Sequence, residues 1–236
     1  MSAKKWVALV LFALAVAFDL AAVHLDIPLM ERVAKPLLMP LVLLNALLAL
    51  EGTMAPRWLA TLLTFVLCFH CAGDIFLMYG AFPLFMAGLA CFLTGHLFYV
   101  TIFIKKGVFD NLQTGWHFLA SFVVILLPVL LVNIIGFEGP IKYAVVVYAY
   151  VLLYVVLCGL AGYLNRRSGV SHPAYWLVFA GGLIFLFSDF LLAWTSILGH
   201  SFPHTGLLVM VTYILAECLI VTGIVRPYLK AGRRQG

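Results

Sequence analysis

Long runs of apolar residues, each close to 20 residues and separated by short charged segments, dominate this sequence. A helix needs roughly 20 apolar residues to cross the hydrocarbon core of a bilayer. Hydrophobic residues make up 65% of the 236 residues and charged residues only 10%, whereas soluble domains carry about 25% charged residues. Lipid offers no hydrogen-bond partners to an open backbone, and the runs do not alternate polar with apolar residues as β-barrel strands do. The sequence therefore predicts an all-α integral membrane protein.

The charged breaks between the runs predict a bundle of eight transmembrane helices that forms a single transmembrane domain, residues 1–236. The second run is short, so its helix is either little tilted or extended by residues of its flanking loops. Pro36 suits the first turn of a helix, where the missing N–H costs nothing. The expected bounds of the helices are 6–23, 36–50, 58–79, 82–104, 116–135, 141–164, 174–198 and 205–225.

The basic residues of the loops predict the orientation of the bundle. Cytoplasmic loops of membrane proteins carry an excess of Lys and Arg. With a cytoplasmic N-terminus, only Arg32, Lys35 and Lys142 fall on the outer side, which predicts that both termini are cytoplasmic. The net charge of +5 thus indicates topology, and we expect no nucleic-acid partner. The inner side would carry Lys4, Lys5, Arg57, Lys105, Lys106, Arg166, Arg167, Arg226, Lys230, Arg233 and Arg234.

Two aspartates, Asp74 and Asp189, lie inside apolar runs. A carboxylate inside a bilayer costs at least a few kcal/mol, so such residues usually face the bundle interior and mark function. The functional interpretation is an acid–base pair, in which one carboxyl group stays protonated and the other acts as a base. The alternative is that each aspartate satisfies a buried lysine or a backbone group. Asp189 falls deeper in its run, which favours it as the proton donor.

Other polar residues in or beside the runs would support this pair. From the direction of each span, we expect most of them to line one cavity that opens towards the outer half of the membrane. Lys35 would pair with Asp74 or bind a phosphate, or would reach the water at the membrane surface. Glu217 would be a cavity wall, a third carboxylate or an inter-helix hydrogen bond, and Asp19 ranks below it. The full supporting set is Lys35, His96, Tyr99, Ser188, Tyr213 and Glu217.

The sequence gives weaker support to a bound metal ion or to a nucleophilic serine. His70 and Asp74 are four residues apart and share a helix face, with His96 as a possible third ligand. No HExxH-type or clustered His/Cys pattern accompanies them, so we interpret both histidines as hydrogen-bonded interior residues and predict no metal and no cofactor. Ser188 has no histidine next to it in the sequence, which gives serine hydrolysis little support.

Four segments in order carry a resemblance to a known family: AKPLLMPLV (34–42), GDIFLM (73–78), FMAGLACFLTGHLFYV (85–100) and GGLIFLFSDFLLA (181–193). The sequence resembles the lysoplasmalogenase-like YhhN family of eight-span membrane proteins. The third segment matches the family's Phe-x-x-Gly-x-x-x-Phe-x-x-x-His-x-x-Tyr span through Phe85, Gly88, Phe92, His96 and Tyr99. The segment TYILAECLIVTG (212–223) resembles the final span but carries Glu217 where the family commonly has Gln.

The resemblance implies hydrolysis of the vinyl-ether bond of a lysoplasmalogen, which gives a fatty aldehyde and a glycerophospho-ethanolamine or -choline. It makes Asp74 and Asp189 the catalytic pair. If a single-chain lipid enters between the helices with its headgroup towards the mouth, Lys35 would meet the phosphate, and His96 and Tyr99 would order the water or an aspartate. The partner would be a lysophospholipid within the bilayer, and the expected location is the bacterial inner membrane. A proton-coupled or lipid-binding transporter and a metal-dependent intramembrane lipid hydrolase stay open as alternatives. The sequence gives no oligomeric state.

Overall fold

The computed structural model describes residues 2–110, 114–139, 141–165, 172–200 and 202–231, and within these ranges it contains helices and no strand. This arrangement confirms the predicted all-α class. The helices are α1 (Ala3–His24), α2 (Pro28–Leu50), α3 (Arg57–Leu77), α4 (Phe82–Lys105), α5 (Thr114–Ile135), α6 (Ile141–Leu164), α7 (Tyr175–Ser196) and α8 (Thr205–Ala231).

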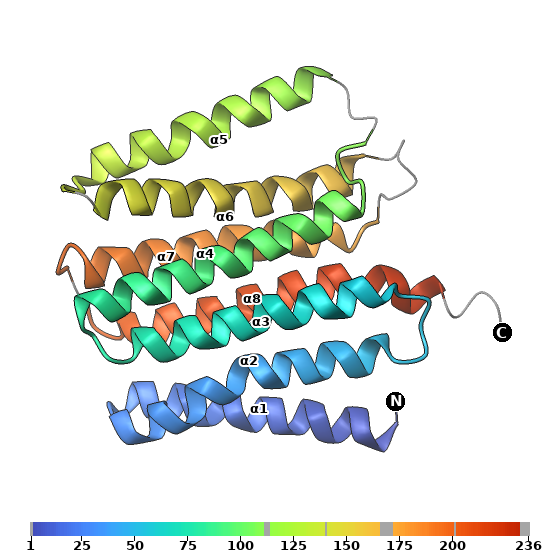
Figure 1. Cartoon of the computed structure of the whole chain (residues 1–236). Helices are drawn as coiled ribbons and strands as arrows, with labels where there is room; N and C mark the ends of the chain where they lie inside the picture. Colours follow the sequence, from blue (N-terminus) through green and yellow to red (C-terminus); the bar gives the residue numbers. More distant parts are fainter. Residues whose placement is uncertain (1, 111–113, 140, 166–171, 201, 232–236) are drawn as a thin grey trace.

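The helices lie side by side in one elongated bundle (Figure 1). Helices α1 and α2 form one edge, α3, α4, α7 and α8 form the centre, and α6 with α5 forms the other edge. Short loops make α1–α2, α3–α4 and α7–α8 packed neighbours, and α5 packs against α6. The N-terminus and the C-terminal end of α8 lie at the same end of the bundle (Figure 1). That placement agrees with an even number of crossings, while the cytoplasmic location of this end stays a prediction.

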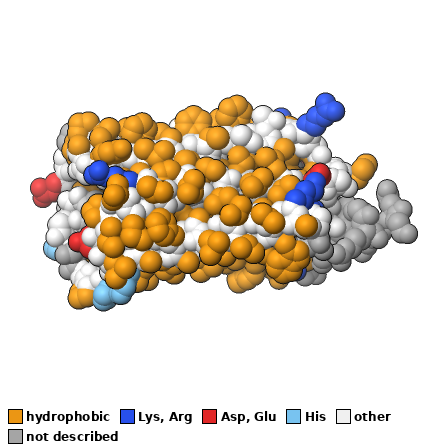
Figure 2. Space-filling view, turned by 90° about the horizontal axis from the view of Figure 1, so that it is seen from below, with side chains coloured by type: hydrophobic (Ala, Val, Ile, Leu, Met, Phe, Trp, Pro, Cys, Tyr) orange, Lys and Arg blue, Asp and Glu red, His pale blue; other side chains and the backbone are white. Residues whose placement is uncertain are grey.

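The surface of the bundle is apolar and its interior holds polar groups, which is the reverse of a soluble protein. Large apolar side chains such as Leu14, Phe65 and Ile134 are exposed. Hydrophobic side chains cover the middle of the face shown in Figure 2, and charged side chains lie towards its two ends. Among the residues that the structure describes, seven helices are long and apolar enough to cross a membrane, while the apolar stretch Phe122–Ile135 of α5 is shorter. The chain is therefore an integral membrane protein, and an eighth crossing by α5 stays a prediction.

Helix α2 begins eight residues before the predicted start. It starts at Pro28, so Pro36 and Pro40 lie inside the helix and the prediction of Pro36 in the first turn is wrong. The charged residues that ended the apolar run are compatible with a helix, because Glu31 and Lys35 pair one turn apart on its surface. Pro36 donates no hydrogen bond to the preceding turn, and its carbonyl oxygen accepts one from Cys71 of α3 at 3.4 Å.

Two glycines let α7 approach its neighbours on both sides. A Cβ atom on Gly181 would lie 2.8 Å from the Ile220 side chain of α8, and one on Gly182 would lie 2.8 Å from the Val156 side chain of α6. Small residues at these positions allow backbones to come together inside a membrane. The approach places the polar segment of α7, which includes Asp189, in the centre of the bundle between α6 and α8.

Candidate functional site

Side chains from five helices form a polar cluster inside the apolar bundle. The members on one helix are three or four residues apart, so that each pair shares a face. All are buried except Asp189, which is partly exposed. We call this set the interior polar cluster: His70 and Asp74 of α3, His96 and Tyr99 of α4, Tyr148 of α6, Asp189 of α7, and Tyr213 and Glu217 of α8.

Glu217 lies at the centre of the cluster. One carboxylate oxygen, Oε1, makes a short hydrogen bond with Nδ1 of His70. The other, Oε2, accepts a hydrogen bond from the Tyr99 hydroxyl at 2.7 Å. Of the roles that the sequence left open for Glu217, the structure shows the inter-helix hydrogen bond, which ties α8 to α3 and α4. Glu217 is also close enough to interact electrostatically with both Asp74 and Asp189.

Asp74 is held by a tyrosine of α8. The Tyr213 hydroxyl donates a hydrogen bond to Oδ2 of Asp74 at 2.9 Å, and only 4% of Asp74 is exposed. Lys35 lies within electrostatic range of Asp74, but its ammonium group pairs with Glu31 on its own helix. Lys35 therefore lies near Asp74, but the two side chains form no direct ion pair.

Asp189 is held by a different tyrosine, Tyr148. The Tyr148 hydroxyl donates to Oδ2 of Asp189 at 2.5 Å, and Nε2 of His96 lies 3.1 Å from the same hydroxyl. Sequence reasoning missed Tyr148. A tyrosine inside an apolar helix usually needs a hydrogen-bond partner, but the same helix also carries Tyr143, Tyr150, Tyr154 and Tyr163. Nothing in the sequence indicates which of the five faces the interior.

The two aspartates share no hydrogen bond in the part of the chain that the structure describes. The ring of Phe92 packs against Gly73, where an added Cβ would lie 2.7 Å from the ring, and its centroid is 5.8 Å from that of Tyr213. Phe92 thus covers the side of the cluster where Asp74 and Tyr213 lie. The two aspartates are linked instead through Glu217, which is their common electrostatic neighbour.

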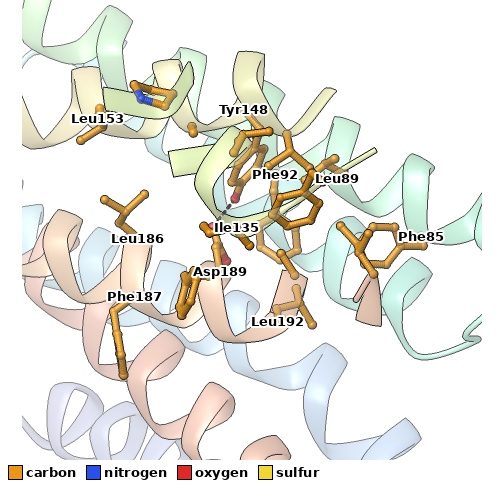
Figure 3. A pocket seen from close by; sticks show the side chains of 18 of the residues that line it. Phe85, Leu89, Phe92, Ile135, Tyr148, Leu153, Leu186, Phe187, Asp189 and Leu192 are labelled. Atoms are coloured by element: carbon orange, nitrogen blue, oxygen red, sulfur yellow. Dashed lines mark hydrogen bonds between the residues drawn. The ribbon is translucent and has the colours of Figure 1, made fainter. Parts of the chain in front are cut away.

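A cavity of about 370 Å³ lies beside Asp189. Its walls come mainly from α4, α5, α6 and α7, and nearly all of its lining side chains are apolar, among them Phe85, Phe92 and Leu186. Tyr148 and Asp189 are its polar lining residues, and Figure 3 shows their hydrogen bond among apolar side chains. Asp74 is not part of this lining. The cavity thus combines an apolar chamber with one acidic group.

The other polar residues singled out in the sequence lie apart from this cavity. The Ser188 hydroxyl donates to the Val209 carbonyl oxygen of α8 at 2.9 Å and so joins α7 to α8. Asp19 of α1 is fully buried, and neither of its oxygens has a hydrogen-bond partner. Within the described ranges, no group of three His, Cys, Asp or Glu side chains is arranged to hold a metal ion.

Gly95 provides the space for the His70 ring. A Cβ atom on Gly95 would overlap with the imidazole of His70. We therefore expect Gly95→Ala to lower the free energy of unfolding by about 1–3 kcal/mol, as overpacking of a core does, measured by thermal unfolding in detergent. Gly206→Ala is the matched control, because its Cβ would meet Val23 at an ordinary 3.5 Å. Equal stability of the two variants would contradict the assigned packing of His70.

Comparison with known proteins identifies the family of the chain. A sequence model described as the YhhN family matches residues 30–224, a range that contains the whole interior polar cluster. The chain belongs to the YhhN family. A human relative of this YhhN protein, named "Lysoplasmalogenase TMEM86B", is 33% identical over 156 residues. The match covers 65% of this chain and 59% of the human protein, so the chain spans about three fifths of that relative's length. No solved structure matches the chain.

Proposed function

We propose that this YhhN protein is a lysoplasmalogenase, which hydrolyses the vinyl-ether bond of a lysoplasmalogen to a fatty aldehyde and a glycerophospho-ethanolamine or -choline. The observation that carries the proposal is the carboxyl group of Asp189 on the wall of an otherwise apolar cavity. The family membership and the name of the human relative support the same activity. The expected location is the bacterial inner membrane, with both termini cytoplasmic.

The cavity suits a single-chain amphiphile. Its apolar side chains would surround the alkenyl chain, and its polar lining residues, Tyr148 and Asp189, would lie beside the ether oxygen. Helix α5 forms one wall through Pro128, Val132 and Ile135 and lies at the edge of the bundle (Figure 1). A substrate dissolved in the bilayer would therefore enter from the side, and its headgroup would stay near the membrane surface.

The proposed chemistry needs an acid and a base. Asp189, as the protonated acid, transfers its proton to the β-carbon of the vinyl ether, which leaves an oxocarbenium ion beside the aspartate. Water adds to this cation, and Asp74 accepts the proton that the water loses. The resulting hemiacetal breaks into an aldehyde and the glycerol hydroxyl, so that one water molecule is consumed. Glycosidases use two carboxyl groups for a comparable oxocarbenium ion.

Neighbouring residues would support the two aspartates. Asp74 does not line the cavity, whereas the Phe92 ring lines it and also packs against Gly73, the neighbour of Asp74 in the sequence. We therefore propose that this ring turns aside to admit the water. Lys35 provides a positive charge near Asp74, and the Tyr213 hydroxyl orients the Asp74 carboxylate. His96 acts on Asp189 through Tyr148.

Two substrates that differ in one double bond test the function. Purified protein is expected to release aldehyde from a lysoplasmenyl lipid, and to release none from the alkyl-ether analogue of the same chain and headgroup. The alkyl ether has no carbon that can accept a proton to form the oxocarbenium ion. Aldehyde is measured by a coupled dehydrogenase. Absence of aldehyde from the lysoplasmenyl lipid would overturn the proposal and favour a transporter or a lipid-binding protein.

A further inference from the structure

The reaction proposed above gives no direct role to Glu217 and His70, although both are fully buried at the centre of the bundle. Hydrogen bonds join three groups on one side, Asp189 to Tyr148 and Tyr148 to His96. They join three groups on the other side, His70 to Glu217 and Glu217 to Tyr99. The rings of His70 and His96 meet edge to face, with centroids 4.9 Å apart. The two series of hydrogen-bonded side chains therefore meet at His70 and His96.

The hydrogen bonds determine which nitrogen of His96 carries a proton. A tyrosine hydroxyl has one proton, and that of Tyr148 is donated to Asp189. The Tyr148 oxygen therefore accepts from Nε2–H of His96. In a neutral imidazole the second nitrogen is then an acceptor. Nδ1 of His96 is buried without a hydrogen-bond partner, so it is available to receive a proton.

His70 is arranged to supply that proton. Its Nδ1 bonds to Glu217, whose second oxygen already accepts from Tyr99. An imidazolium paired with a carboxylate is protonated on both nitrogens. In that state Nε2 of His70 is a donor, and it too is buried without a partner. The donor and the acceptor belong to adjacent rings, and a single buried water molecule would bridge them.

We propose that the Glu217–His70 pair is a proton store that recharges Asp189 through His96 and Tyr148. The proposal rests on the lysoplasmalogenase reaction above, in which Asp189 loses one proton in each turnover and Asp74 gains one. Tyr213 bonds to Asp74 and is one helical turn from Glu217 on α8. The proton that Asp74 accepts from water would return to the acid by way of the Glu217–His70 pair.

One proton leaves the store and one reaches Asp189. Nε2–H of His70 gives a proton to the bridging water, which passes one to Nδ1 of His96, and Nε2–H of His96 gives its own to the Tyr148 oxygen. The Tyr148 hydroxyl passes its proton to the carboxylate of Asp189. His70 becomes neutral, Asp189 becomes a carboxylic acid, and His96 exchanges one neutral tautomer for the other. Asp74 has gained one proton from water in the same turnover, and the return of that proton to the Glu217–His70 pair completes the cycle.

Ionisable groups from several helices face this store. Helix α3 contributes His70 and Asp74, and Lys35 of α2 lies within electrostatic range of Asp74. Helix α4 contributes His96, which interacts with His70, and Tyr99, which interacts with Glu217. The other groups within electrostatic range of Glu217 are Tyr148 of α6, Asp189 of α7, and Tyr213 and Cys218 of its own helix α8.

Two variants interrupt the route without removing a catalytic aspartate. Glu217→Gln keeps an oxygen that accepts from Tyr99 but cannot store a proton. Tyr148→Phe removes one oxygen atom between Asp189 and His96. Each is expected to lower kcat by about tenfold or more, to remove one ionisation from the pH–rate profile, and to raise the solvent deuterium isotope effect. Tyr150→Phe is the matched control, because this tyrosine of the same helix bonds to the Ile125 carbonyl oxygen outside the cluster. Unchanged pH profiles and isotope effects in Glu217→Gln and Tyr148→Phe would overturn the proposal of a proton store.

Infrared difference spectra separate this proposal from the proposed function, because they need no turnover. The carboxylic-acid band of Asp189 is identified by its loss in Asp189→Asn. Its titration is expected to shift in Glu217→Gln and in Tyr148→Phe, and to stay unchanged in Tyr150→Phe. If the wild-type protein releases no aldehyde but the two variants show these shifts, the lysoplasmalogenase assignment fails. The coupling between Glu217 and Asp189 then still stands. If Asp189 titrates identically in all three variants, the proton store fails even where aldehyde is released.

Discussion

Replacement of Asp189 by Asn is expected to lower the rate of aldehyde release by a factor of about 10²–10⁴, the usual contribution of a general acid. The amide has nearly the same shape as the carboxyl group, and its oxygen still accepts from the Tyr148 hydroxyl. The apolar lining of the cavity is untouched. The variant therefore loses the transferable proton while it keeps the fold and the space for the substrate. The measurement is kcat for a lysoplasmenyl lipid, with thermal unfolding as the test of the fold.

Glu51→Gln is the control for this result. It makes the same change of acid to amide on a side chain that is exposed and pairs with Lys4 near the N-terminus. Its activity is expected to equal that of the wild-type protein. An Asp189→Asn variant that folds normally and retains near-normal activity would show that Asp189 is not the acid. The cavity would then have to obtain its proton from another group.

Replacement of Asp74 by Asn is the second large effect that we expect, a loss of about 10²–10⁴ in kcat from the removal of a general base. The amide oxygen can still accept from Tyr213, so the link between α3 and α8 is kept. Because Asp74 does not line the cavity, affinity for the unreactive alkyl-ether analogue should stay unchanged. Titration calorimetry with that analogue measures the affinity, and aldehyde release measures kcat.

The comparison of the two aspartate variants also tests the proposal that the Phe92 ring must move before Asp74 can act on water in the cavity. A base that acts only when Phe92 moves aside affects the chemical step and not the binding of the chain. If Asp74→Asn weakened binding of the analogue as much as it lowered kcat, Asp74 would be a binding residue. Near-normal kcat in Asp74→Asn would remove it from the mechanism altogether.

Much of the fold follows from the sequence because the thickness of a bilayer determines the length of each helix. The apolar runs gave the order of the helices, and the short loops made consecutive helices neighbours. The start of α2 was placed too late, since Glu31 and Lys35 ended the apolar run but not the helix. Charge indicates where lipid ends, whereas a helix continues for as long as its backbone hydrogen bonds are satisfied.

The sequence indicated which residues belong to the candidate site but not which of them form hydrogen bonds with one another. Asp74, Asp189 and Glu217 were visible because an acid in an apolar run is costly unless it faces the interior of the bundle. The choice of Tyr148 as partner of Asp189, and of His70 as partner of Glu217, depends on how each helix is rotated. Helices that are apolar all round carry little periodicity from which to read that rotation. The position of Asp189 on the cavity wall, with Asp74 outside the lining, is a property of packing alone.

The apolar walls of the cavity have a consequence for how the protein samples its substrate. Among the described lining residues Asp189 is the one acidic group, and the rest are almost wholly apolar. The proposed lysolipid substrate would therefore partition between the chamber and the surrounding acyl chains on nearly equal terms. The quantity that governs occupancy is then the mole fraction of substrate in the membrane or micelle, not its concentration in the aqueous volume. Saturation curves recorded at different detergent contents should coincide when plotted against that surface fraction.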